Sequence, residues 1–400
     1  MLQDKLQSCH KICNIVTIRT LPMLHFKLHA CNITSNIMKR KRMLTTRQQS
    51  ILDSFLESPD AAKSISDLPD FGLERTTVFR DLRKMVDSGL LLAKGKSYQL
   101  NKRSDAYLEW DLTRPPHQRS VVPYNPSFLA DYQPNTTFML SAEQLQAMER
   151  IGAVSGLSAA KGLGKNYERV LASLLIDLTH ASSNLENVQI SWLDTKTLLE
   201  FGERPGGLTE TQMRIVLNHK NAIAYLMEHG QDLSIARKDL MDIHSLLITG
   251  LLKDASAVGC LRKAIVKIDG SQYLPPDNPH QLNEAFEEFC QKAQEIANPY
   301  EQAFFAMVFL PYLQPFQDGN KRTSRIVMNI PLVRNELAPF SFSDMGKREY
   351  MFGLLAFYER GVPGILAKSF VAAYARSAGR YADMIQHVNA GGILSTISEN

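Results

Sequence analysis

The chain is poor in features that would place it in several large classes of protein. Its 400 residues contain five cysteines, which show neither the paired spacing of a zinc site nor the density of a disulfide-linked domain. These are Cys9, Cys13, Cys31, Cys260 and Cys290. A run of about 18 apolar residues, which a membrane-spanning helix would need, is also missing. We therefore expect a cytoplasmic protein from a reducing compartment, with no membrane partner.

The chain also has little excess of one sign of charge over the other. The formal net charge is only +4, so any contact with nucleic acid has to come from a local basic patch and not from the whole surface. With 44% hydrophobic and 22% charged residues, the composition is that of a globular chain long enough for two or three domains with sizeable cores.

Acidic residues are almost absent from residues 1–42, where Asp4 is the single carboxylate and a Lys39-Arg40-Lys41-Arg42 cluster ends the segment. No helical or strand periodicity continues through it. One interpretation is an over-long gene start, with translation from Met43; the other is a genuine basic arm or targeting peptide. We assign no function to this extension.

Residues 43–104 have the pattern of a small domain of three helices and a hairpin. Apolar residues at helical spacing predict the helices, and Gly95 lies in the turn of the hairpin. The residues are Ile51, Leu52, Phe55 and Leu56 for the first helix, Ile65 and Leu68 for a short second one, and Val78, Leu82, Met85 and Val86 for the third. This order of elements resembles a winged helix-turn-helix.

The third of these helices carries basic and hydroxyl side chains away from its apolar face. They are Arg75, Thr76, Thr77, Arg80 and Arg83, and Lys94 and Lys96 follow in the hairpin. Such side chains reach phosphates and base edges in a major groove, which predicts binding to double-stranded DNA. The alternative is an ordinary solvated face on a module that docks another protein.

Proline and aromatic residues are concentrated in 105–140, which predicts an extended arm that wraps against the larger domain. From 141 to 400 helical periodicity dominates. The clearest segments are Leu171–Thr179, Gln212–Met227, Ile243–Leu252, Leu282–Ala297, Tyr300–Leu313 and Arg322–Arg334. The one strong β signal, Arg262–Ile268, predicts a hairpin. We expect a mainly α domain with this single small hairpin.

The most informative segment is 314–325, Gln-Pro-Phe-Gln-Asp-Gly-Asn-Lys-Arg-Thr-Ser-Arg, which we call the signature turn. It lies between two apolar helical stretches, so its backbone N–H groups and a helix N-terminus face one small volume. Lys321, Arg322 and Arg325 add three cations, and Asp318 offers a carboxylate for magnesium. Together these groups predict a polyphosphate site.

The signature turn resembles that of the Fic (Fido) family, His-x-Phe-x-Asp/Glu-Gly-Asn-Gly/Lys-Arg-x-x-Arg, at every fixed position except the first. The resemblance implies transfer of AMP from ATP, with Mg²⁺, to a Ser, Thr or Tyr hydroxyl of a protein, this chain included. It also implies that Asp318, Gly319, Asn320, Lys321, Arg322 and Arg325 bind the nucleotide and that Asn320 and Arg322 serve catalysis. In the family a His is the general base, and Gln314 stands at that position here. A positioned general base typically increases the reaction rate by about 10²–10⁴-fold.

Two further motifs fit the same family. Gly259, Arg262 and Tyr273 resemble the entry and exit of the flap hairpin that aligns the target protein. Ser182 and Glu186, within Ser-Ser-Asn-Leu-Glu-Asn, resemble the inhibitory motif whose Glu pairs with the last arginine of the signature, and so predict an ion pair between Glu186 and Arg325. The same spacing also suits a helix N-terminus with a serine cap.

Two functions follow from the sequence. The first is a Fic-type adenylyltransferase homologue that binds ATP and Mg²⁺ with impaired chemistry. The second is a DNA-binding regulator whose helical domain senses a nucleotide or a partner; whether the chain forms a homodimer is left open. Among the remaining residues, we interpret Phe316 as a core anchor and His244 as a buried, hydrogen-bonded histidine, and His280 is the one histidine to consider as a substitute base.

Overall fold

The computed structural model describes residues 44–155 and 165–389. These residues form two compact units, the first of 44–87 with 91–100 and the second of 88–90 with the described residues from 101 onward. The basic extension at 1–42 lies outside the described residues. Among the helices of the described chain, none combines the length and the apolar character that crossing a bilayer requires.

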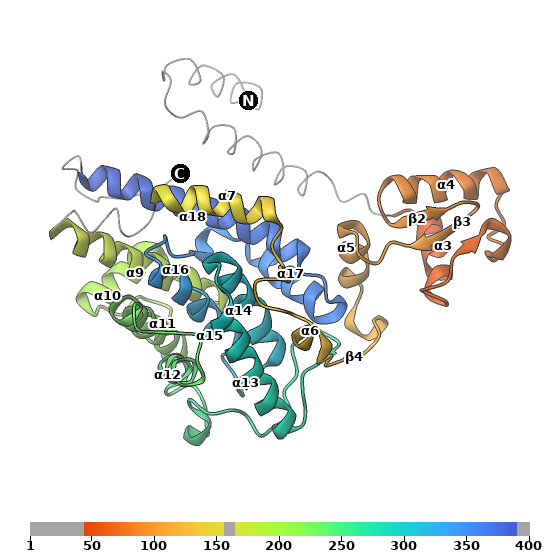
Figure 1. The fold of residues 1–400 in the computed structure, drawn as a ribbon. Helices are drawn as coiled ribbons and strands as arrows, with labels where there is room; N and C mark the ends of the chain where they lie inside the picture. Colours follow the sequence, from red (N-terminus) through yellow and green to blue (C-terminus); the bar gives the residue numbers. More distant parts are fainter. Residues whose placement is uncertain (1–43, 156–164, 390–400) are drawn as a thin grey trace, which may run out of the picture. The chain divides into compact units, whose positions relative to one another are not determined.

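The first unit contains the helices and the hairpin that the sequence predicts. Its elements are α3 (Thr46–Leu56), β1 (Lys63–Ser64), the 3₁₀ helix η2 (Ile65–Asp67), α4 (Arg75–Asp87), β2 (Leu91–Lys94) and β3 (Ser97–Leu100) (Figure 1). The strands pair antiparallel in the order β1-β3-β2. Gly95 turns the β2–β3 hairpin with φ 62°, a left-handed conformation that glycine adopts without strain. The predicted second helix is only one 3₁₀ turn.

A small core and one ion pair hold this unit together. A capping box at Thr45 and Gln48 starts α3, and its apolar face turns inward. The buried apolar residues are Ile51, Leu52 and Phe55 on α3, Val78, Leu82 and Met85 on α4, and Leu91 and Leu100 in the hairpin. Asp81, almost fully buried on α4, accepts two hydrogen bonds from the guanidinium of Arg47 on α3. The opposite face of α4 is therefore left to solvent.

The second unit is mainly helical, as the sequence predicts. Its first elements are α5 (Asp105–Thr113), η3 (Pro116–Gln118), β4 (Val122–Pro123), α6 (Ser127–Ala130), α7 (Ala142–Ser155), α9 (Lys165–Leu185), α10 (Trp192–Phe201), α11 (Glu210–His229) and α12 (Arg237–Ile248). They are followed by η4 (Ala255–Ala257), β5 (Tyr273–Leu274), α13 (Pro279–Glu295), α14 (Pro299–Leu313), α15 (Asn320–Val327), α16 (Ile330–Arg334), η5 (Phe342–Asp344), α17 (Lys347–Arg360) and α18 (Gly364–Asn389). Its only described strands, β4 and β5, pair in parallel.

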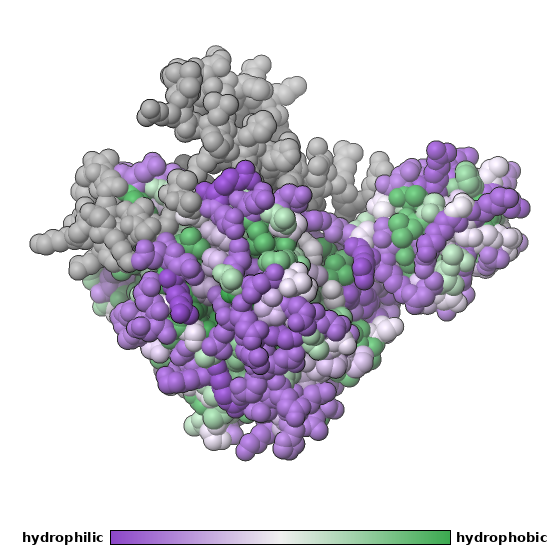
Figure 2. Space-filling model, in the orientation of Figure 1, coloured by the Kyte–Doolittle hydropathy of each residue, from purple (hydrophilic) through white to green (hydrophobic). Residues whose placement is uncertain are grey.

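Helix α14 is the centre of this unit. It is apolar on all sides, and from Ala303 to Leu313 every side chain is buried. A helix without a polar face must be surrounded, and α13, α15, α16, α17 and α7 all pack against it (Figure 1). Because the apolar side chains gather there, the face drawn in Figure 2 is mostly hydrophilic. The chain leaves α14 at its C-terminal end, directly before the signature turn.

The aromatic arm wraps onto α14, as predicted. The ring of Tyr124 lies 5.6 Å from that of Tyr312, and the ring of Tyr132 lies 4.7 Å from that of Phe305. The buried carboxylate of Glu301 on α14 accepts hydrogen bonds from the Tyr132 hydroxyl and from two backbone amides at the end of the arm. The arm is not extended throughout, since its first residues form helix α5.

The helix expected at Arg322–Arg334 is two helices, α15 and α16. The break lies at Asn329, whose side-chain amide donates to the Arg325 and Phe340 carbonyls and whose side-chain oxygen accepts from the Phe340 amide. Pro331 follows within the first turn of α16, where it has no N–H to bond. Helix α12 likewise ends at Ile248, four residues earlier than expected, because Gly250 adopts φ 73°.

The predicted strand at Arg262–Ile268 was wrong: the segment forms no strand and therefore no hairpin. Its alternating pattern does suggest one, but a strand needs a partner, and Ile265 is 70% exposed instead of paired. The side chain of Arg262 turns inward and binds carbonyl oxygens of neighbouring turns. These contacts hold the segment in an irregular conformation.

A buried ion pair ties this irregular segment and the arm to α17. One carboxylate oxygen of Glu359 accepts from Arg119 Nη1 at 2.8 Å, from the Ser271 hydroxyl at 2.9 Å and from the Gln272 amide at 2.9 Å. Both charged side chains are essentially inaccessible to solvent. Arg119 also donates to the Gly270 carbonyl at 2.7 Å.

We expect Glu359→Ala to destabilise the second unit by about 3–5 kcal/mol, because it leaves the Arg119 cation buried without its partner. The measurement is urea unfolding followed by tryptophan fluorescence, since both tryptophans, Trp110 and Trp192, lie in this unit. The control Asp242→Ala, which breaks an exposed pair with Lys238, should leave the midpoint nearly unchanged. Equal midpoints for the wild type and Glu359→Ala would contradict the assigned role.

Candidate functional site

The signature turn leaves one helix and enters another through two left-handed residues. Gln314 ends α14 at φ 48° and ψ 55°, and Gly319 precedes α15 at φ 80°. A Cβ at Gly319 would lie 2.7 Å from Ile248 Cδ1. Position 319 therefore requires glycine for its backbone angle and for its close approach to α12. The first N–H groups of α15 form one wall of the site.

A buried histidine, His244, packs against the signature turn and holds it in place. The rings of His244 and Phe316 stack at 3.8 Å with an interplanar angle of 7°. His244 Nδ1 accepts the Gly259 amide at 3.0 Å, so Nε2 carries the proton and donates to the Asp318 carbonyl at 3.1 Å. Burial lowers the pKa of His244 to about 4, which keeps it neutral. The interpretations of His244 as a buried, hydrogen-bonded histidine and of Phe316 as a core anchor are confirmed.

The carboxamide of Gln314 is bonded at both ends. Its Nε2 donates to the Pro311 carbonyl at 2.6 Å, and its Oε1 accepts from Asn320 Nδ2 at 2.9 Å. Asn320 also bonds both the amide and the carbonyl of Phe316, which closes the turn. Gln314 is only 8% exposed. The two amide side chains are thus parts of the framework of the turn.

The residues expected in a flap hold the turn in place instead of forming a hairpin. Arg262 is buried and donates to the Gln314 carbonyl at 2.6 Å and to the Pro276 carbonyl at 2.5 Å. The Tyr273 hydroxyl donates to the Tyr312 carbonyl at 2.9 Å. Gly259, with φ 68°, bonds His244 as described above. These contacts fix the left-handed end of α14.

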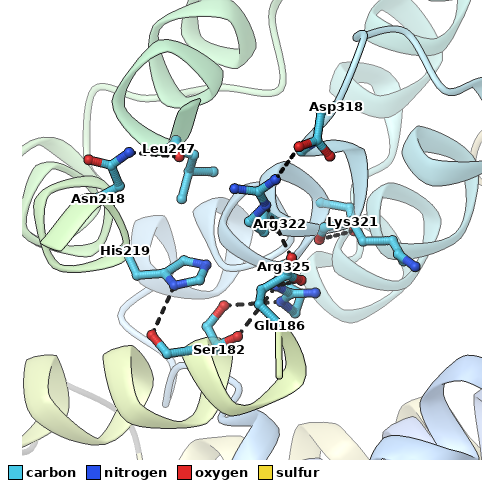
Figure 3. A network of polar contacts seen from close by, with 12 residues as sticks. Ser182, Glu186, Asn218, His219, Leu247, Asp318, Lys321, Arg322 and Arg325 are labelled. Atoms are coloured by element: carbon cyan, nitrogen blue, oxygen red, sulfur yellow. Dashed lines mark hydrogen bonds and ion pairs between the residues drawn. The ribbon is translucent and has the colours of Figure 1, made fainter. Parts of the chain in front are cut away.

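Alternating charges line the other side of the turn (Figure 3). Asp318 Oδ2 lies 2.7 Å from Arg322 Nη2, and Arg322 Nε lies 3.3 Å from Glu186 Oε2. The second oxygen of Glu186, Oε1, lies 2.7 Å from Arg325 Nη2, so the predicted ion pair is present. Arg325 Nε also donates to the Ser182 hydroxyl at 3.0 Å. One carboxylate therefore bridges both guanidinium groups of α15.

The electrostatics favour an anion at this point. Burial alone would raise the pKa of Glu186, but Arg325 and Arg322 outweigh it and lower that pKa to about 2. Burial lowers the pKa of Lys321, whose side chain comes from the same helix. Arg322 Nη1 is buried and has no hydrogen-bond partner within the described chain. The site therefore keeps a spare donor beside a carboxylate that is fully ionised at neutral pH.

The motif that supplies Ser182 and Glu186 lies at the C-terminal end of α9. The alternative of a serine-capped helix N-terminus is therefore wrong. Asn187 follows in the left-handed conformation, φ 62°, and its side-chain oxygen accepts from Lys347 at 2.5 Å. Three elements, α15, α11 and α17, hold this last turn in place.

The contact from α11 is His219. The sequence does not single out this residue, because no motif distinguishes one histidine within a helix. Its Nδ1 is 3.0 Å from the Ser183 hydroxyl. His219 is fully buried, and burial, followed by the Arg325 cation, lowers its pKa to about 3. It stays neutral and fixes the turn that presents Glu186.

The other predicted residues belong to other elements and take no part in this network. Thr77 is half-buried on α4, and the remaining DNA-binding candidates are exposed on α4 and on the β2–β3 hairpin of the first unit: Arg75, Thr76, Arg80, Arg83, Lys94 and Lys96. His280, the candidate substitute base, is exposed in the first turn of α13.

We expect His219→Gln to make the free energy of unfolding depend less steeply on pH below about pH 6.5. The folded-state pKa of His219 is depressed, so its contribution is fully present above pH 6.5 and is lost as the pH falls toward 3. Between pH 6.5 and 4.5 the slope for the variant should be shallower by about 1.4 kcal/mol per pH unit. Urea unfolding at stepped pH measures this, with the exposed His280→Gln as control. Parallel profiles for His219→Gln and the wild type would refute the assignment.

Comparison with known proteins agrees with this geometry. The Fic/DOC family model matches residues 234–332, which include the whole signature turn and its support from α12. The protein adenylyltransferase Fic of Culex quinquefasciatus is 25% identical over 236 residues, which are 58% of this chain and 46% of that protein. That of Drosophila persimilis is 23% identical over 267 residues, or 65% and 51%. The chain thus spans about half the length of the curated relatives it matches.

Two solved structures are also similar. Fic-1 of C. elegans gives a TM-score of 0.48 at 18% identity over 60% of this chain and 71% of that one. A Fic domain containing signaling protein of Bacteroides thetaiotaomicron gives 0.49 at 18% identity, over 62% and 100%. The family match begins at the turn before α12 and runs through α15. Residues 234–332 of this chain accordingly have the sequence pattern of the Fic/DOC family.

Proposed function

We propose that this chain is a Fic-type protein adenylyltransferase homologue that binds ATP with Mg²⁺, is restrained by Glu186 and has weak chemistry because Gln314 replaces the general base. The observation that carries the proposal is the single carboxylate of Glu186 across two guanidinium groups at the head of α15. A carboxylate there occupies the position that suits phosphate oxygens. The names of the relatives support the same reaction class.

The residues present fit a nucleotide polyphosphate. The N-terminal amides of α15, Lys321 and the unpartnered Nη1 of Arg322 would hold phosphate oxygens, and Arg325 would do so once Glu186 withdraws. Asp318 would bind Mg²⁺ on release from Arg322. Within the described residues no three His, Cys, Asp or Glu side chains are grouped to hold a metal ion, so Mg²⁺ would need phosphate ligands as well. Bound Mg²⁺ would neutralise charge on those phosphates.

The proton of the attacking hydroxyl has no evident acceptor in the turn. Gln314 is not basic near neutral pH, and its amide is already bonded to Pro311 and Asn320. Both ring nitrogens of His244 are occupied, and His219 is fully buried beneath the Glu186 turn. The phosphate-binding groups are therefore retained without a base, which supports slow transfer or nucleotide sensing.

We expect Glu186→Gly to bind Mg-ATP about tenfold more tightly than the wild type, because Arg322 and Arg325 no longer hold a competing carboxylate. Isothermal calorimetry measures the affinity. Adding Gln314→His should raise self-labelling from ATP carrying a radioactive α-phosphate by about 10²–10⁴-fold.

Three control variants make this test specific. Glu200→Gln removes an exposed carboxylate on α10 and should change neither result. Glu186→Gln retains the size of the side chain and should bind ATP with intermediate affinity. Adding Arg325→Ala to the double variant should abolish labelling. If Glu186→Gly gives no heat with any magnesium nucleotide, the proposal fails.

A second function, sequence-specific DNA binding by the first unit, is favoured by one observation. The solvent face of α4 and the tip of the β2–β3 hairpin are basic: Arg75, Arg80, Arg83, Lys94 and Lys96 are all exposed. Asp81, one of the acidic residues of α4, is buried and paired with Arg47, so it does not offset this charge. We infer a winged helix-turn-helix that places α4 in a major groove, in a regulator whose Fic/DOC domain senses a nucleotide or a protein partner.

We expect the full chain to bind duplex DNA with an affinity that falls steeply with salt, and Arg80→Ala to weaken it about tenfold or more. Fluorescence anisotropy at several salt concentrations measures both effects. Lys94→Ala should weaken binding uniformly across sequences and reduce the salt slope by about one. The exposed Lys238→Ala in the second unit is the charge-matched control and should leave binding unchanged. Salt-independent binding would count against DNA as the ligand.

A further inference from the structure

One exposed aromatic side chain lies among the basic residues of α4. Phe79 is 47% exposed, and no other aromatic ring of the described residues stacks against it. Single exposed apolar residues are common on protein surfaces. The position of this one is informative because Thr76 and Arg83, its neighbours toward the solvent face of α4, are hydrogen-bond donors.

Helical spacing brings these residues into one stripe. Thr76, Phe79, Arg80 and Arg83 follow one another at i, i+3, i+4 and i+7, which places them on the same side of α4. The buried residues Val78, Leu82 and Met85 lie on the other side. The stripe is therefore a polar, cationic surface with one apolar ring along its edge, where the stripe meets the buried face of α4.

Each part of this stripe matches a different feature of the major groove. Arginine binds guanine edges or phosphates, and threonine bonds phosphates and base edges. The remaining apolar group of the groove is the C5-methyl of thymine, and phenylalanine is one of the side chains that contact it. No other nucleobase of DNA presents a methyl group there.

We propose that Phe79 is a specificity-determining residue that reads the methyl group of a thymine in the DNA bound by α4. The proposal rests on the DNA-binding function inferred above. It adds the chemistry of one base pair, an A·T pair beside the pairs or phosphates bound by Arg80 and Arg83. The ring would cover the methyl group and exclude water from it.

Replacing thymine by uracil isolates this contact, because uracil keeps the pairing and every hydrogen-bonding group and lacks only the methyl. The probe is a duplex enriched from a random-sequence library by the full-length protein, remade with one deoxyuridine in place of each thymine in turn. At one or two positions we expect wild-type binding to weaken about three- to tenfold. Phe79→Ala should bind the thymine duplex more weakly and show no difference between thymine and uracil there.

Two further variants separate the methyl contact from general weakening. Arg83→Ala should lower the affinity for both duplexes by the same factor and retain the preference for thymine. Phe79→Leu, which keeps an apolar group, should retain part of that preference. Because Phe79 lies at the surface, its variants should keep the circular dichroism spectrum of the wild type.

The remaining outcomes distinguish failure of the DNA-binding function from failure of the contact between Phe79 and thymine. If the library yields no bound DNA, the DNA-binding function itself fails. If DNA is bound but no sequence is enriched, or if no thymine position is sensitive to uracil, binding stands and the reading by Phe79 is overturned. If Phe79→Ala still distinguishes thymine from uracil at the sensitive position, another side chain contacts the methyl.

Discussion

The bridge from the Glu186 carboxylate to the guanidinium groups of Arg322 and Arg325 is the interaction on which the candidate site depends. It joins the end of α9 to the start of α15, segments that are far apart in sequence. Two buried cations beside a helix N-terminus would repel one another, and the carboxylate offsets that repulsion in the absence of another anion. A ligand that brings its own negative charge competes for the same donors. The stability of the site and its occupancy are therefore coupled by one side chain.

The geometry of the turn comes from groups that do not face this volume. Arg262 holds the carbonyl of Gln314, and the stacked pair of His244 and Phe316 supports the loop, which lets Gln314 and Gly319 keep left-handed angles. A position with such angles persists only where its surroundings fix it. The carboxamide of Gln314 fits this framework, so replacement of the base leaves the shape of the phosphate-binding turn in place.

The sequence predicted much of the fold because most of its signals are local. Apolar spacing gave α11, α13 and α14 to within a few residues, and glycine and proline marked turns correctly. The strand at Arg262–Ile268 was wrong because an alternating pattern cannot supply a partner strand. The break at Asn329 was missed because its cause is a set of hydrogen bonds to a residue eleven positions along the chain.

By itself, the sequence determined the residue types of the phosphate-binding turn, the absence of a histidine at its head, and the basic face of α4. These features can be deduced from residues a few positions apart in the sequence, because residues three or four positions apart lie on the same face of a helix. Only the tertiary structure decided that Glu186 contacts two arginines and not one. It also decided that His219 holds the turn before Glu186 in place and that Asp318 forms an ion pair with Arg322. Those facts depend on how α9, α11 and α15 pack, and packing is set by side chains distant in sequence that meet only in the folded chain.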